Sequence, residues 1–113
     1  MALVLPKTVT VGHIDIRIVP MTEERSLKHD IIGNWDDTTG CIEVLETLTP
    51  PKQVEVFLHE LLHAFYENLQ INPRWGEEKM CDALAMALAG VIRYNPGLFS
   101  KLEKVLTKSE PTE

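Results

Sequence analysis

The sequence predicts a single α+β domain, with a three-stranded antiparallel β-sheet in its first half and three helices in its second half. Apolar residues alternate with a period of two up to Glu46, and they recur with the period of a helix after Thr49. The 113 residues suffice for one modest core, and no repeat or linker divides them. We therefore expect one domain over residues 1–113, with frayed ends at residues 1–7 and 107–113.

Three segments of the first half have the pattern of strands. The first covers residues 9–19, where isoleucines alternate with polar residues until Pro20 ends the run. The second covers residues 31–35 and leads into a turn at residues 36–40, which contains two aspartates and a glycine. The third covers residues 41–46. We expect the last two strands to form a hairpin that the first strand joins in an antiparallel sheet.

Three helices are expected after this sheet. The first begins at Pro50, with Thr49 as its N-cap, and continues to about Leu69. The second covers residues 77–93 and is rich in alanine and leucine, so its broad apolar face should be buried. The third is short and covers residues 96–106, with Asn95 before it as the cap.

Composition excludes several functional classes. The formal net charge of −6 gives no support for a nucleic-acid or anionic-membrane surface. No secretory signal pattern and no run of about 18 apolar residues is present. Cys41 and Cys81 match neither a disulfide framework nor a paired-cysteine zinc site, so we expect reduced thiols and a cytoplasmic protein.

One motif suggests chemistry. His59, Glu60 and His63 form a His-Glu-x-x-His pattern inside the first expected helix. Histidines four residues apart lie one turn apart on one helix face, where two neutral imidazoles can converge on a cation such as Zn²⁺. Glu60 lies about 100° around the helix, and it can reach a water beside the metal as a general base. The alternative is a pair of surface histidines beside a solvated glutamate.

A zinc site that keeps a position for water needs a third protein ligand. No further histidine follows at the required spacing, so the candidates are the carboxylates Glu77, Glu78 and Asp82 of the next helix. Glu78 and Asp82 lie four residues apart on one face, and we expect Glu78 to bind the metal while Asp82 accepts the remaining N–H of a ligand histidine. Glu77 is the alternative ligand. Both glutamates would also suit the positive end of a helix without any metal.

These residues resemble the motifs of a known family. His-Glu-Leu-Leu-His at residues 59–63 and Glu-Lys-Met-Cys-Asp at residues 78–82 resemble the two motifs of gluzincin metallopeptidases. In size and in its strand-rich first part, the chain resembles the minimal phage and prophage metallopeptidases of the ImmA/IrrE type. The resemblance covers residues 31–102, including Asn-Pro-Gly-Leu at residues 95–98. It implies a minimal zincin-like fold and an intracellular zinc peptidase of phage origin with a pared-down cleft.

Two functions follow as hypotheses. In the first, Zn²⁺ is the cofactor, a peptide or protein is the substrate, and Glu60 moves a proton from the attacking water to the leaving amine. The substrate would pair with residues 41–46 as the edge of the sheet. In the second, the chain is a metal-binding regulatory or structural partner protein without peptidase activity. The glutamate favours the enzyme, because a purely structural site needs no base beside an open metal position.

Overall fold

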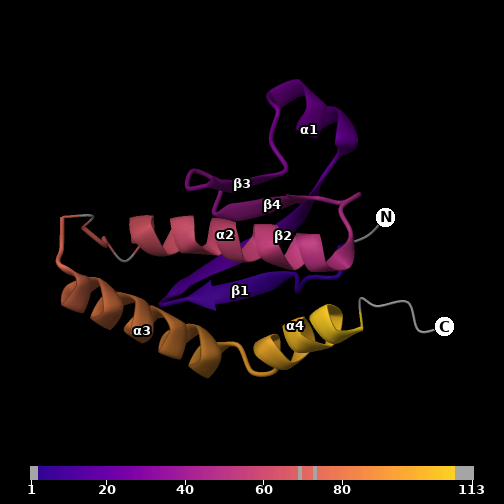
Figure 1. Cartoon of the computed structure of the whole chain (residues 1–113). Helices are drawn as coiled ribbons and strands as arrows, with labels where there is room; N and C mark the ends of the chain where they lie inside the picture. The colour runs from indigo at the N-terminus through magenta and orange to yellow at the C-terminus, as the bar shows by residue number, and fades with distance from the viewer. Residues whose placement is uncertain (1–2, 69, 73, 109–113) are drawn as a thin grey trace.

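The structure is a computed structural model that describes residues 3–68, 70–72 and 74–108, without the side chains of Glu77, Cys81 and Asp82. It is an α+β fold, as predicted. Figure 1 shows α2 lying across the sheet, α3 and α4 following one another on the side of β1, and α1 projecting beyond β3. None of the helices in these ranges has the length and apolar character that crossing a membrane requires. In chain order the elements are β1 (Thr8–Val11), β2 (Ile14–Met21), α1 (Glu23–His29), β3 (Gly33–Asp36), β4 (Cys41–Leu45), α2 (Pro50–Asn68), α3 (Glu77–Tyr94) and α4 (Leu98–Thr107).

The sheet has four strands in the order β1-β2-β4-β3 and is mixed, which corrects the expected three antiparallel strands. β1 pairs antiparallel with β2 and β3 antiparallel with β4, whereas β2 and β4 run parallel. The alternating run of residues 9–19 forms two strands because the chain reverses at Gly12, whose φ of 63° carries little steric cost for a glycine. Alternation continues on both sides of this turn, so the pattern alone does not reveal it.

The strand expected at the edge of the sheet lies inside it. Residues 41–45 form β4, which is paired on both sides, and the adjacent edge is β3. After β2, the helix α1 leads the chain to the position of the edge strand, where β3 forms. The turn after Asp36 then reverses the chain, and β4 fills the position between β2 and β3. Asp36 Oδ1 accepts the Thr38 N–H at 2.9 Å in this turn, and that bond lowers the pKa of the Asp36 carboxyl below its usual range.

A polar cluster around Glu43 ties α1 and β3 to β4. Arg25 donates two hydrogen bonds to the Glu43 carboxylate, at 2.8 and 2.9 Å, and Asn34 Nδ2 donates a third at 3.3 Å. The hydrogen bond to Glu43 raises the pKa of the Arg25 guanidinium. Because Asn34 belongs to β3, this cluster helps to fix the edge strand in its place beside α2.

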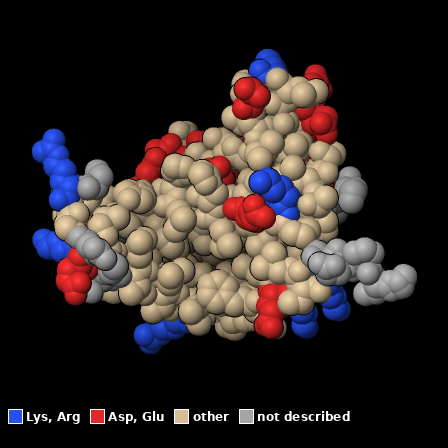
Figure 2. All heavy atoms as spheres, in the orientation of Figure 1, with Lys and Arg blue, Asp and Glu red and all other residues tan. Residues whose placement is uncertain are grey.

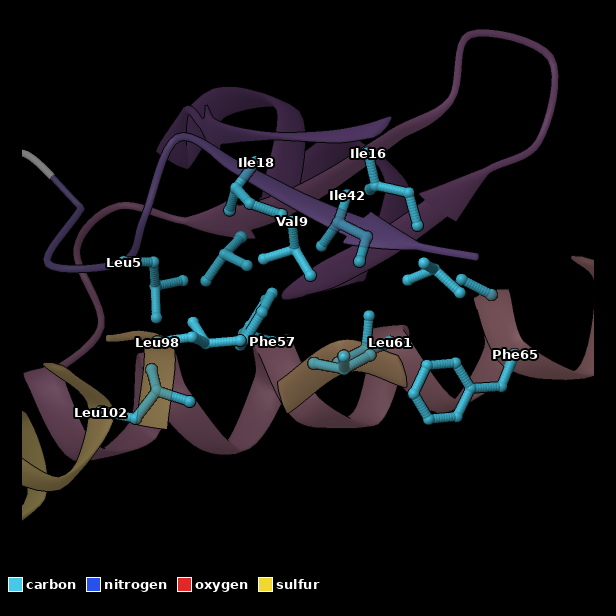
Figure 3. Packing of buried hydrophobic residues seen from close by; sticks show 14 of the residues in the cluster. Leu5, Val9, Ile16, Ile18, Ile42, Phe57, Leu61, Phe65, Leu98 and Leu102 are labelled. Atoms are coloured by element: carbon cyan, nitrogen blue, oxygen red, sulfur yellow. The ribbon is translucent and has the colours of Figure 1, made fainter. Parts of the chain in front are cut away.

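The core lies between the sheet and α2. Figure 3 shows side chains from the strands, among them Ile16 and Ile42, pointing toward Phe57 and Leu61 of α2. Burial of one face stabilises a helix of this length more than its intrinsic propensity does. The expected last residue of the helix, Leu69, lies outside the described ranges. The buried positions of α2 are Gln53, Val54, Val56, Phe57, Leu61, Ala64 and Phe65.

The buried side chain of Gln53 anchors the start of the chain to α2. Its Oε1 accepts the Val4 N–H at 2.9 Å, and its Nε2 donates to the Leu48 carbonyl at 3.1 Å. Leu5 is buried in the core. The chain is therefore held from Val4 onward, within the segment 1–7 that was expected to be frayed.

The helix α3 buries a narrower face than its composition suggests. Ala87 and Val91 are buried, and Ala83 and Leu84 are half-buried and pack against the core, but Leu88 is 45% exposed, so the expected apolar face is buried only in part. The space-filling view in Figure 2 shows charged side chains at the rim of the molecule, a neighbouring acidic and basic group near the middle of this face, and uncharged surface below them.

Asn95 joins α3 to β1 instead of capping the last helix. Its Oδ1 accepts the Thr10 N–H at 2.7 Å, and its Nδ2 donates to the carbonyls of Thr10 at 2.9 Å and Val91 at 2.8 Å. The helix α4 begins at Leu98, after Gly97 with a φ of 83°. A residue in this left-handed conformation cannot be part of a right-handed helix, and glycine adopts the conformation at little steric cost. The helix therefore starts after Gly97 and not at the expected Pro96.

Candidate functional site

The three residues of the His-Glu-x-x-His motif lie on the side of α2 away from the core. His59 and His63 are exposed and Glu60 is half-buried, whereas Leu61 and Phe65 between and beyond them are buried. Packing of the buried residues fixes the rotation of α2 about its axis, because an amphipathic helix can bury its apolar stripe in one orientation only. The histidine pair is thereby directed outward.

The two imidazoles are close neighbours. Their ring centroids lie 4.9 Å apart, and the ring planes meet at 70°. Two imidazoles bound at about 2.1 Å to one tetrahedral ion place their centroids about 5 Å apart, so the observed spacing suits a shared Zn²⁺. Neutral imidazole is also the donor that Zn²⁺ commonly takes in proteins. In spacing and chemistry, His59 and His63 fit as two of the ligands of a zinc ion.

A groove runs between this side of α2 and the edge strand β3. It has two neighbouring parts, of about 410 and 310 Å³, whose linings share Gly33 and Glu60. His59 lines the larger part and His63 the smaller one. All three residues of the motif therefore line a groove that lies beside the free edge of β3. The larger part is lined by Asp30, Ile31, Ile32, Gly33, Lys52, Glu55, Val56, His59 and Glu60, and the smaller by Gly33, Asn34, Trp35, Glu60, His63 and Glu67.

The edge strand offers main-chain groups to this groove. The Leu45 N–H donates to the Ile32 carbonyl at 3.0 Å, and β3 pairs with β4 antiparallel in that register. In an antiparallel pair the residues alternate between bonding their partner strand and facing away from it. Ile32 and Asn34 face β4, so the N–H and carbonyl groups of Gly33 and Trp35 point to the free edge, where an extended peptide can pair with them.

Gly33 sets how closely β3 approaches α2. A Cβ at this position would lie 3.2 Å from Glu60 Oε2 and well inside contact distance of Val56 Cγ1. Only glycine therefore allows the strand edge to lie directly over Glu60. Sequence reasoning did not identify this residue, although a glycine inside a strand pattern is a signal of close backbone approach.

We expect Gly33→Ala to destabilise the fold by about 1–3 kcal/mol, because an added methyl group overpacks the contact between β3 and α2. Val56→Ala removes the methyl group that the new Cβ would meet. The double variant Gly33→Ala with Val56→Ala should therefore be less destabilised than the sum of the single variants. Urea denaturation monitored by circular dichroism measures all three free energies of unfolding.

Gly90→Ala in α3 is the matched control, because an added Cβ there meets no atom within 4 Å. Helix propensity predicts that it is neutral or stabilising, by up to about 1 kcal/mol. Strictly additive free energies for Gly33 and Val56 would contradict the close approach of the two elements.

The structure does not assemble the expected third ligand with the histidines. Glu78 is exposed at the start of α3, and within the described part of the chain no group of three His, Cys, Asp or Glu residues is placed to hold a metal ion. The side chains of Glu77 and Asp82, the alternative ligand and the expected hydrogen-bond acceptor, lie outside that part. The described residues thus bring the two histidines together, and the metal and its third ligand stay predictions.

Trp35 and Glu67 extend the site beyond the motif. The Trp35 indole Nε1–H donates to Glu67 Oε1 at 3.2 Å, which joins the edge strand to the last turns of α2. Glu67 follows His63 by four residues, and this helical spacing is the signal that could have placed it beside the motif.

Comparison of the chain with profiles of known protein families, with curated proteins and with solved structures finds no match in any of the three. The assignment of function therefore depends on the groove and on the residues that line it.

Proposed function

We propose that this protein is a zinc-dependent metallopeptidase of the cytoplasm, in which His59, His63 and a carboxylate of α3, Glu78, hold the metal. The observation that carries the proposal is the position of the motif: both imidazoles and Glu60 lie in one groove beside the free edge of β3. A purely structural metal site would need neither an acidic neighbour nor an open groove for an extended chain.

In this proposal the metal and Glu60 have separate roles in the reaction. When bound, the zinc ion supplies Lewis acidity, which polarises a peptide carbonyl and makes a water molecule more acidic. The Glu60 carboxylate accepts a proton from the attacking water, and it later delivers that proton to the nitrogen of the leaving amine. Its half-buried position beside Gly33 holds it at the floor of the groove, where an extended substrate would lie.

The edge strand positions the substrate. Pairing with the main-chain groups of Gly33 and Trp35 would hold a peptide along β3, with its backbone above Glu60. Main-chain hydrogen bonds of this kind are independent of side-chain identity, so they give affinity and alignment, and the walls of the groove give selectivity. The substrate is accordingly a peptide or an extended segment of a protein.

The proposal is tested by removing and restoring the metal. Dialysis against a chelator should abolish cleavage of a mixed peptide library, and addition of about one equivalent of Zn²⁺ per chain should restore it. Cleaved bonds are identified by mass spectrometry before and after reconstitution. Cleavage that survives chelation would contradict a metallopeptidase. A zinc-loaded protein that cleaves no member of the library would favour the metal-binding partner function instead.

A further inference from the structure

We infer that a second copy of the chain supplies the third zinc ligand, so that Glu78 of one copy binds the metal held by His59 and His63 of the other. The inference deepens the proposed function and rests on its metal site, because it assigns the partner that completes this site. It depends on where α3 directs Glu78, and on two outward-facing apolar rows, one on α2 and one on α3.

The packing of α3 directs Glu78 outward. Ala87 and Val91 bury one face of the helix against the core, and Asn95 fixes its end through two hydrogen bonds with Thr10, at 2.7 and 2.9 Å. Glu78 precedes Ala87 by nine residues, about two and a half turns, so it lies on the opposite face and is exposed. Turning Glu78 inward would expose Ala87 and Val91. The fold thus holds this carboxylate at the surface, and the described residues of one copy supply no third donor beside the histidines.

The outward face of α3 is otherwise apolar and partly made of small residues. Ala85, Ala89 and Ile92 follow Glu78 at helical spacing and continue its row along the helix. The two alanines are exposed, and Ile92 is 55% exposed. From Ala83 to Ile92 no residue is charged. Because the distance between packed helices depends on the side chains at their contact, these alanines allow another helix to approach closely.

A second apolar row lies beside the histidines of α2. Leu62 and Tyr66 are 49% and 39% exposed, and they follow His59 by three and seven residues on the outward face of the helix. Neither of them lines the groove along β3. A helix that packs on this row therefore contacts the helix face that carries the metal ligands and leaves the peptide groove open.

A second copy of the chain fits both rows. Its α3 has an apolar face for α2 and, at the start of that face, the carboxylate that two histidines need for a zinc site with an open position. In a two-fold dimer each α3 lies on the α2 of the other copy, and the same contact forms twice. Each chain then contributes two histidines to one site and Glu78 to the other.

The test mixes metal-free variants that lack different parts of the site. His59→Ala with His63→Ala keeps Glu78, and Glu78→Ala keeps both histidines. Neither variant should bind Zn²⁺ tightly alone, whereas their equimolar mixture should bind up to about one Zn²⁺ per pair of unlike chains, because one site of the pair is complete. Glu78→Ala mixed with the triple variant is the control, since no pairing of these chains has a complete site. Competition with a chromophoric zinc chelator measures the binding.

The mass of the zinc-loaded protein in solution is a second readout. Light scattering after size-exclusion chromatography should give twice the 12.8 kDa of the chain for the wild type. Ala89→Glu would bury a charge in the contact, so it should give the mass of one chain and weaken zinc binding as much as Glu78→Ala does. Leu27→Glu places the same charge on α1, at a leucine that is 75% exposed and outside both rows, and it should change neither quantity.

Zinc binding by the mixture that is no stronger than that of the separate variants would overturn the inference. A zinc-loaded wild type with the mass of one chain would overturn it too. Either result, in a protein that cleaves peptides, would leave the proposed function in place with its third ligand in the same chain. Restored zinc binding in a mixture, together with a wild type that cleaves no peptide, would support the shared site and count against the peptidase.

Discussion

Replacing Glu60 with glutamine is expected to lower peptide turnover by about 10²-fold or more, the usual scale for a lost general base. The amide of glutamine has nearly the size and shape of the carboxylate, but it cannot take up the proton of the attacking water. Zinc binding should be unchanged, because Glu60 lies beside the histidine pair and is not one of the proposed ligands. The fold should also be retained, since Glu60 is only half-buried.

Turnover and zinc content should be measured on one preparation of each variant. Glu55→Gln is the matched control, because Glu55 is an exposed glutamate of the same helix that lines the same groove. It should retain wild-type turnover. Equal cleavage by wild type and Glu60→Gln would show that a contaminating protease or a different base is responsible.

The second large effect concerns the third metal ligand. Glu78→Ala should weaken zinc binding severely, because it removes one of three protein donors. Asp82→Ala should weaken it about 10–100-fold, the range typical of a residue that orients a ligand histidine through a hydrogen bond. Glu77→Ala should have little effect, although it precedes Glu78 directly. Competition with a chromophoric zinc chelator measures the three dissociation constants.

Comparison of the zinc dissociation constants of the three variants shows which carboxylate of α3 is the third ligand. Loss of the metal in Glu77→Ala, with retention in Glu78→Ala, would show that the ligand is one residue earlier in α3. Unchanged zinc binding in all three variants would show that no carboxylate of this helix completes the site.

The sequence predicted the helices better than the sheet, for physical reasons. The apolar spacing of α2 and the proline at its start are local features, and the helix begins at Pro50 as expected. Strand order depends on pairing between distant segments, so the alternation of Ile14 and Ile42 could not show that their strands run parallel. The hairpin turn at Gly12 and the crossover through α1 were what changed three antiparallel strands into four mixed ones.

Of the candidate site, the sequence could predict only the local geometry of one helix. Four-residue spacing on a helix was enough to place His59 and His63 together, and the structure has them 4.9 Å apart. The groove could not be predicted from the sequence, because it depends on which strand occupies the edge of the sheet and on the absence of a side chain at Gly33. The spacing of four residues could have placed Glu67 beside His63, but its bond with Trp35, 32 residues away along the chain, could not be predicted.

The most direct measurement of the central claim is the zinc content of the purified protein by inductively coupled plasma mass spectrometry. We predict about one Zn²⁺ per chain in the wild type and none in the double variant His59→Ala with His63→Ala. The chain has two other histidines, His13 and His29, both exposed, and alanine at both should leave the zinc content unchanged. Stoichiometric zinc in the His59 and His63 double variant, or a wild type that cannot be loaded with zinc, would contradict the account.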